Sequence, residues 1–130
     1  MIIDSSALIA ILHAEPDASA FANAMDRADS CRISAVNYVE SAVVIDARRC
    51  PIASRRFDNF CREAELIVEH VTPEQAQIAR EAYRDFGKGR HRAGLNLGDC
   101  FAYALAKAVG EPLLFKGSDF RHTDIEPAEV

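Results

Sequence analysis

The sequence of 130 residues contains no long apolar run, no internal repeat and no polar low-complexity stretch. A membrane-spanning helix needs about 18 consecutive apolar residues, and no segment approaches that length. The apolar run from Ala7 to Leu12 is short, follows Asp4 and has no basic stretch before it, so we do not expect a signal peptide. These absences predict a soluble protein with no membrane partner. The length fits a single domain over residues 1–130.

Closely spaced cysteines are also missing. Cys31, Cys50, Cys61 and Cys100 form no C-x-x-C pair and no Cys/His spacing typical of tetrahedral zinc. We therefore expect isolated structural thiols. A reducing, cytoplasmic location is the expectation that follows.

The sequence lacks a basic excess, since its formal net charge is −5. Proteins that grip nucleic acid by overall charge neutralise phosphates with Lys and Arg, so this composition argues against that class. Local basic patches are nevertheless present. One is the run from Lys88 to Arg92, and the other is a central group of arginines: Arg48, Arg49, Arg55, Arg56 and Arg62.

Short apolar segments alternate with helical patterns along the whole chain. The candidate strands are Met1–Ile3, Cys31–Ser34, Leu66–Val71 and Pro112–Phe115. Between them, apolar residues recur at the three- and four-residue spacing of amphipathic helices. This alternation predicts an α/β fold in which a parallel sheet is covered by helices on both faces.

Three aspartates lie where acids of open α/β sheets bind ligands. Asp4 and Asp119 follow candidate strands, and the carboxyl ends of parallel strands meet at one edge of the sheet. Asp99 lies in the first turn of a helix, after a stretch that Gly94 and Gly98 keep irregular. Asp4 and Asp99 also fit plain capping acids, because the free N–H groups of a helix start stabilise a carboxylate.

Glu40 is harder to explain as a structural residue. The predicted helix from Ala35 to about Arg49 has an apolar stripe that we expect to be buried: Val36, Val39, Val43, Val44 and Ala47. At about 100° per residue, Glu40 projects from within this stripe. A buried carboxylate is costly unless it is paired or bound to a metal, so we expect Glu40 to need a cation.

Together the acids predict a metal site. If the strand ends share one edge of the sheet, Asp4, Glu40, Asp99 and Asp119 would repel one another unless a hard divalent cation lay among them. Mg²⁺ or Mn²⁺ favours such oxygen ligands and keeps some of its waters. A site of this kind can activate a water and hold phosphate oxygens for in-line phosphodiester cleavage.

Three stretches carry most of this pattern. They are the opening IIDSSALIAIL, the segment SAVNYVESAVV, which contains Glu40, and the run YRDFGKGRHRAGLNLGDCFAYALAKAVGEPLLFKGSDF. With the order and spacing of the four acids, they resemble the PIN-domain ribonucleases, specifically the VapC toxins of bacterial toxin–antitoxin pairs. The resemblance covers nearly the whole chain. It implies a PIN-like three-layer α/β/α fold with a central parallel sheet of about four or five strands.

The resemblance also implies a function and roles for individual residues. It implies a metal-dependent endoribonuclease toxin that hydrolyses RNA phosphodiester bonds to arrest growth, with Mg²⁺ or Mn²⁺ as cofactor. Asp4, Glu40 and Asp99 would be the metal-site acids, Asp119 the fourth acid, and Ser6 a hydroxyl that assists near Asp4. The implied partners are RNA, a cognate VapB-type antitoxin and a second copy of the chain, so that we expect a homodimer and a hetero-oligomer with the antitoxin.

A basic loop lies just ahead of Asp99. Because Lys88, Arg90, His91 and Arg92 are so close to a predicted metal ligand in the sequence, we predict that they bind the RNA backbone. The alternative is a solvated loop whose charge merely offsets the acidic surface.

Other functional classes fit the residues less well. A haloacid-dehalogenase-type phosphatase needs a second Asp two places after Asp4, where Ser6 stands. A response-regulator receiver could use Asp4 and Lys116, but its phospho-acceptor Asp ends a middle strand, whereas Asp46 falls in a predicted helix. The alternative that stays open is a non-catalytic, RNA-binding PIN scaffold, and behind it a metal-dependent phosphatase.

Overall fold

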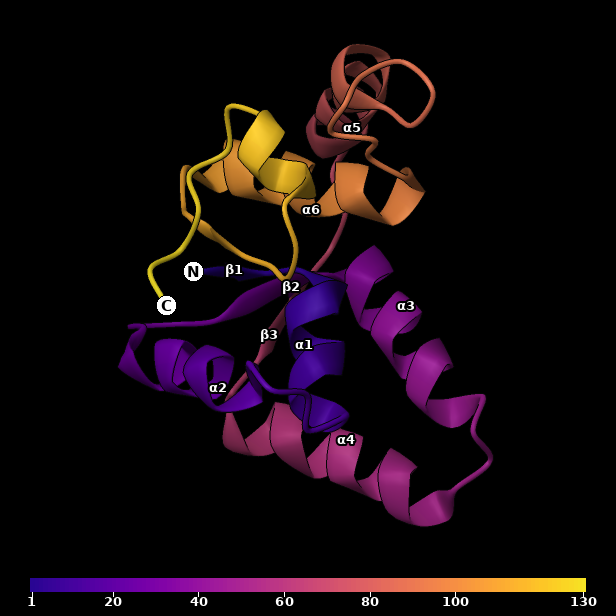
Figure 1. Ribbon diagram of the computed structural model, residues 1–130, viewed down its shortest axis with the longest axis vertical. Helices are drawn as coiled ribbons and strands as arrows, with labels where there is room; N and C mark the ends of the chain where they lie inside the picture. The colour runs from indigo at the N-terminus through magenta and orange to yellow at the C-terminus, as the bar shows by residue number, and fades with distance from the viewer.

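The computed structural model describes residues 1–130 as four short strands, six α-helices and one 3₁₀ helix (Figure 1). The strands are β1 (Ile2–Ile3), β2 (Arg32–Ser34), β3 (Ile67–Glu69) and β4 (Leu113–Leu114). The helices are α1 (Ser5–Leu12), α2 (Ala18–Arg27), α3 (Ala35–Asp46), α4 (Pro51–Glu63), α5 (Pro73–Phe86), α6 (Leu97–Val109) and the 3₁₀ helix η1 (Asp119–His122). None of these helices is both long and apolar enough to cross a membrane. All four cysteines are free thiols, as expected.

The four strands form one parallel sheet in the order β3-β2-β1-β4. Ile2 of β1 pairs with Arg32 of β2 on one side and with Leu113 of β4 on the other. The chain thus moves outward from β1 to β3 and then returns to the far side of β1. In open α/β sheets ligands bind outside the carboxyl ends of the strands where the order reverses, which here is between β1 and β4.

The sheet separates two apolar layers, because successive side chains of a strand point to opposite faces. Ile2 and Leu113 pack with α5 and α6 on one face. Ile3, Ile33 and Leu114 pack with α1, α2 and α4 on the other. Figure 1 shows the strands between these two groups of helices. The three-layer α/β/α fold is therefore confirmed, with four strands.

The helix that the sequence predicts from Ala35 and the helix start that it predicts at Asp99 are both present, as α3 and α6. Ser34 caps α3 and Thr72 caps α5, each accepting a hydrogen bond from a backbone N–H of the first turn. Pro73 then opens α5, where its missing N–H has no intrahelical role. Gly110 ends α6 with a φ of 68°, a conformation that glycine adopts without strain.

The predicted buried stripe of α3 is wrong. Val39 and Val43 are 56% and 59% exposed, whereas the buried residues of α3 are Asn37, Ser41 and Ile45. The buried positions still recur every four residues, but two of them are small polar side chains whose hydrogen-bond donors find partners inside. Apolar residues therefore do not mark the inward face of this helix.

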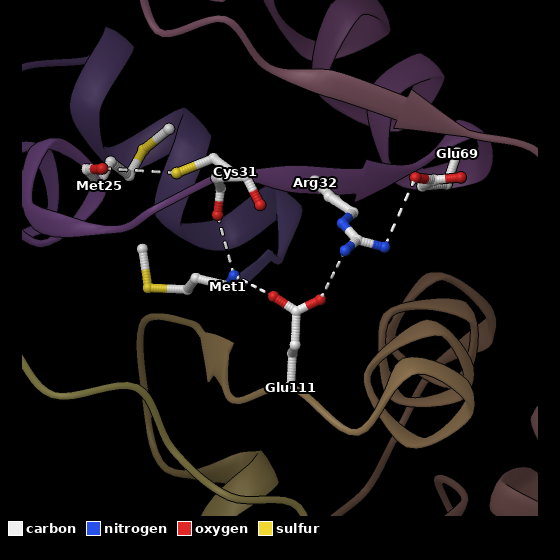
Figure 2. Close-up of polar contacts among 7 residues, drawn as sticks. Met1, Met25, Cys31, Arg32, Glu69 and Glu111 are labelled. Carbon is white, nitrogen blue, oxygen red and sulfur yellow. Dashed lines mark hydrogen bonds and ion pairs between the residues drawn. The ribbon is translucent and has the colours of Figure 1, made fainter.

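Charged groups are paired at the edge of the sheet where strands begin (Figure 2). The amino group of Met1, just before β1, donates to the carbonyl oxygen of Ser30 and to Glu111 Oε1. Arg32 lies between two acids, with its guanidinium 3.1 Å from Glu111 Oε2 and 3.8 Å from Glu69 Oε1. The segments before β1, β2 and β4 are thus tied together by alternating charges, and we call this set the paired edge.

Candidate active site

Asp4 lies at the opposite edge of the sheet, between the end of β1 and the start of α1. Its backbone is extended, and its Oδ2 accepts a hydrogen bond from the backbone N–H of Ser6 at 3.0 Å, so Asp4 is the N-cap of α1. The residue is only 2% exposed, and its Oδ1 has no hydrogen-bond partner. Burial raises the pKa of Asp4 to about 6; hydrogen bonds from Ser6 oppose the shift, and the charges of Asp99 and Glu40 add to it. The capping role does not satisfy this carboxylate.

Glu40 reaches the same edge from α3. Its Oε1 accepts hydrogen bonds from the hydroxyl of Ser5 and, at 3.3 Å, from Nδ2 of Asn37. A Cβ placed on Gly98 would overlap the Glu40 carboxylate, so this glycine makes room for it. The expectation that Glu40 lies in a buried apolar stripe is wrong, since Val39, Val43 and Val44 of that stripe are exposed. Neutral donors hold the carboxylate in place, and its negative charge has no cationic partner.

Asp99 occupies the first turn of α6 and combines two roles. Its Oδ2 accepts from the backbone N–H of Asn96 at 3.0 Å, and the Asn96 side chain accepts from the N–H of Asp99 at 2.9 Å. This reciprocal pair is a capping box. Burial nevertheless raises the pKa of Asp99 against the Asn96 hydrogen bond, and the charges of Asp119 and Glu40 raise it further. Asp99 thus caps its helix and also belongs to the group of acids.

Asp119 and Ser6 complete the edge. Asp119 begins η1, in the turn that follows β4, and its side chain is exposed. The backbone N–H of Lys116, in the same turn, donates to the hydroxyl oxygen of Ser6 at 2.9 Å. The Ser6 hydroxyl also acts on Asp4, since a hydrogen bond from this side chain lowers the pKa of Asp4 against the effect of burial. The ammonium group of Lys116 is directed to Glu15 and Asp17, at 3.2 and 3.4 Å, and to none of the four acids.

Three of the four basic residues of the predicted loop are exposed to solvent, and the fourth, His91, is half-buried. Lys88, Arg90 and Arg92 are exposed, with the Arg90 guanidinium 5.5 Å from the centre of the Tyr83 ring. His91 turns inward, where its ring meets Phe86 edge-on and its Nδ1 accepts from the N–H of Ala93. No hydrogen bond or ion pair joins this loop to the four acids. The loop leads into α6 but makes no hydrogen bond or ion pair with Asp99, the one acid of that helix.

The acids fit a hard divalent cation by their chemistry. All the candidate donors are oxygens, one of them the unpartnered, buried Oδ1 of Asp4, and each of Asp4 and Asp99 carries a raised pKa to which other acids of the group contribute. No three His, Cys, Asp or Glu side chains lie close enough together to hold a metal ion between them. A divalent cation at this edge would therefore contact one or two of the carboxylates and keep several waters, as Mg²⁺ does in most protein sites. A cavity of about 640 Å³ between α2 and α4 is lined by none of these four acids.

The sequence interpretation missed the groups that hold Glu40. Ser5, Asn37 and Gly98 were not among the predicted site residues, although Asn37 is three positions before Glu40 and so shares its side of a helix. Gly98 was interpreted only as a break before α6. Its close approach to a side chain 58 positions earlier is a tertiary contact that a local pattern does not reveal.

Comparisons with known proteins agree on one family. A sequence model described as the PIN domain matches residues 1–126. The chain is 54% identical over 129 residues to ribonuclease VapC28 of Mycobacterium tuberculosis, covering 98% of this chain and 97% of that protein. It is 47% identical over 129 residues to ribonuclease VapC42 of the same organism, covering 98% of each.

Two solved structures share the fold. One is VapC20 of Mycobacterium tuberculosis, described as a sarcin–ricin loop cleaving toxin, with a TM-score of 0.73 and 17% identity, covering 97% of this chain and 98% of that one. The other is a toxin–antitoxin complex from Klebsiella pneumoniae, with a TM-score of 0.73 and 15% identity, covering 99% and 98%. At these identities the likeness extends to the fold alone.

Proposed function

Since the chain belongs to the PIN-domain family and, within it, to the VapC ribonucleases, we propose that it is an endoribonuclease toxin of a toxin–antitoxin pair. In this proposal it hydrolyses RNA phosphodiester bonds and so arrests growth. The observation that carries the proposal is the meeting of Asp4, Glu40 and Asp99 at one sheet edge with no cationic side chain among them. Repulsion among these carboxylates lowers the stability of the fold, but the same negative charge would bind the divalent cation that a metal-dependent nuclease needs.

The proposed site uses Mg²⁺ or Mn²⁺ held by Asp4, Glu40, Asp99 and Asp119, directly or through water. When bound, the cation supplies a Lewis acid that activates a water and stabilises charge on the phosphate oxygens. Asp4 offers the unpartnered Oδ1, and Glu40 offers the oxygen that its hydrogen-bond donors leave free. Ser6, whose oxygen accepts from the N–H of Lys116, links Asp4 to the turn after β4 and so helps to orient the Asp4 carboxylate.

The direct test is cleavage of RNA by purified protein with and without added Mg²⁺ or Mn²⁺. We expect new RNA ends only when metal is present, and none after removal of the metal with a chelator. Binding of RNA without cleavage under all these conditions would favour the non-catalytic scaffold. Release of inorganic phosphate from small phosphomonoesters, without internal cuts in RNA, would favour the phosphatase. Sequencing RNA ends after brief expression would identify the substrate.

We propose that the exposed basic side chains of the loop before α6 guide the RNA backbone to the site. For a single strand, removing one side chain that binds a phosphate makes the dependence of log affinity on log salt shallower by about 0.7. Changing Arg90 and Arg92 together to Ala should flatten that slope by about one unit or more and leave metal affinity nearly intact. An unchanged slope with normal cleavage would show that this loop is solvated and does not bind RNA. The path would then be sought among the arginines of α4 and the residues before it: Arg48, Arg49, Arg55 and Arg56.

A cognate antitoxin is the proposed partner that keeps the toxin silent. An acid-rich edge without cations accepts an inserted arginine through charge-assisted, often bidentate hydrogen bonds. Co-expression with the antitoxin encoded beside it should restore growth and give a complex that purifies together. Free toxin from that co-expression would refute the pairing. A cytoplasmic location, where RNA and antitoxin are both met, is part of this proposal.

The homodimer is proposed on the exposed apolar face of α3. Val39, Val43 and Val44 lie on this face, and Leu97 at the start of α6 is also exposed, at 72%. Exposed apolar groups of this kind mark interaction surfaces in many soluble proteins. Sedimentation of Val39→Lys and Val43→Lys variants should show a monomer where the parent shows a dimer. A parent protein that sediments as a monomer at micromolar concentration would refute this part.

A further inference from the structure

The two carboxylate oxygens of Glu40 have different surroundings. Oε1 accepts both hydrogen bonds, one from the Ser5 hydroxyl and one from Asn37 Nδ2. Oε2 lies closest to Gly98, over a position where any side chain would collide with it, and has no hydrogen-bond donor. The carboxylate is therefore held through one oxygen, and the other is kept unpaired.

Asn37 makes a second contact that extends this arrangement to α6. Its side chain is fully buried, and the same Nδ2 donates to the backbone carbonyl oxygen of Gly98 at 2.9 Å. The amide orientation is fixed, because a flipped amide would place Oδ1 against two acceptors. Gly98 immediately precedes Asp99, so one side chain links the Glu40 carboxylate to the turn that carries Asp99.

We propose that Asn37 is a positioning residue of the metal site, acting with Gly98 and Ser5. It holds Glu40 through Oε1 so that Oε2 stays available to a cation, and it fixes the spacing between α3 and the first turn of α6. Side chains that hold a metal ligand from behind affect metal affinity by about 10- to 100-fold, because a ligand fixed beforehand loses less freedom on binding. This inference rests on the proposed metal-dependent function and adds to it the residues that prepare the ligand.

The variants Asn37→Ala and Gly98→Ala test the arrangement from its two sides. The first removes the donor, and the second fills the space under Oε2 while favouring the helix, in which alanine is a better residue than glycine. Ser41→Ala is the matched control, because Ser41 is equally buried on the same face of α3 and its hydroxyl donates to the backbone oxygen of Asn37, with no hydrogen bond to the Glu40 carboxylate.

The measurement is calorimetric titration of Mn²⁺ into each metal-free protein without RNA, alongside the Mn²⁺ concentration for half-maximal cleavage and the rate at saturation. We expect Asn37→Ala and Gly98→Ala to bind Mn²⁺ about 10- to 100-fold more weakly, and Ser41→Ala to bind like the parent. If the two site variants melt at lower temperature yet bind Mn²⁺ like the parent, the role of Asn37 is structural and the inference is wrong, while the proposed function stands. A parent protein that binds no Mn²⁺ overturns both.

Discussion

Acidic side chains form ion pairs at one edge of the central sheet and remain unpaired at the other. At the paired edge, Glu111 meets the amino group of Met1 and the guanidinium of Arg32, and Arg32 continues to Glu69 (Figure 2). At the edge where strands end, Asp4, Glu40, Asp99 and Asp119 form no ion pair, and the charge of Lys116 is directed to Glu15 and Asp17. Glu111 thus has two cationic partners, whereas the four acids near Asp4 have none.

The ion pairs of the paired edge stabilise the fold, whereas the unpaired acids of the other edge do not, so those acids need another explanation. Partly buried acids are normally paired, because an unpaired carboxylate out of water is unfavourable. The acids at the carboxyl edge are held by neutral donors such as the Ser6 and Asn96 backbone and the Ser5 hydroxyl, which orient them without neutralising them. A cation that binds and takes part in chemistry needs such a prepared, uncompensated site.

Replacing one acid of the carboxyl edge should have the largest effect. Asp99→Asn keeps size and shape but removes charge that a hard cation needs, so we expect cleavage to fall by at least about 10²- to 10³-fold and growth arrest to be lost. The metal-free variant should melt no lower than the parent, because repulsion with Glu40 and Asp119 is relieved. Cleavage assays, growth on induction and thermal melts check this. A fully toxic Asp99→Asn protein would contradict the site assignment.

The next effect is a pH dependence of stability in the metal-free protein. The folded state holds the proton of Asp4 up to a pKa of about 6, against an ordinary value of 3.8, so it binds more protons than the unfolded chain between these values. Its unfolding free energy should therefore rise as pH falls from 7.5 to 5, by about 1 to 2 kcal/mol from Asp4. This contribution is fully present below pH 3.8 and is lost as pH rises through 6.

Urea denaturation at the two pH values measures the change, and Asp4→Asn is the control that should remove most of it. The pKa of Asp124 is lowered by its hydrogen bonds to Tyr103 and Lys107, so its contribution is lost only at lower pH and does not enter this range. A parent protein that loses stability between pH 7.5 and 5 would show that the carboxyl edge is not strained by its charges.

Breaking the paired edge should give a smaller effect of opposite sign. Glu111→Gln removes the charge that Met1 and Arg32 share, and since these groups are partly exposed we expect a loss of about 1 kcal/mol or less. RNA cleavage at saturating metal should be unchanged. Urea denaturation and cleavage rates check both statements. A gain in stability from Glu111→Gln would remove the contrast between the two edges.

How much the sequence predicted depends on whether a feature is local. The strand positions, the helix that begins at Ala35 and the position of Asp99 in the first turn of a helix were predicted from short patterns and were confirmed. The inward face of α3 was wrong, because burial of Asn37 and Ser41 depends on partners in other elements. The contacts that hold the Glu40 side chain could not be predicted from periodicity either, because Gly98 and Ser5 are distant from Glu40 in the chain.

The most direct test of the uncompensated edge is the midpoint of thermal unfolding at pH 7.5 as Mg²⁺ or Mn²⁺ is added to metal-free protein. Binding to the folded state alone stabilises by mass action, by about 2.7 kcal/mol at a metal concentration 100 times the Kd. We predict that the midpoint of the parent rises steadily through millimolar metal, while that of Asp4→Asn rises far less. Identical midpoints of the parent across the whole titration would contradict a metal site at this edge.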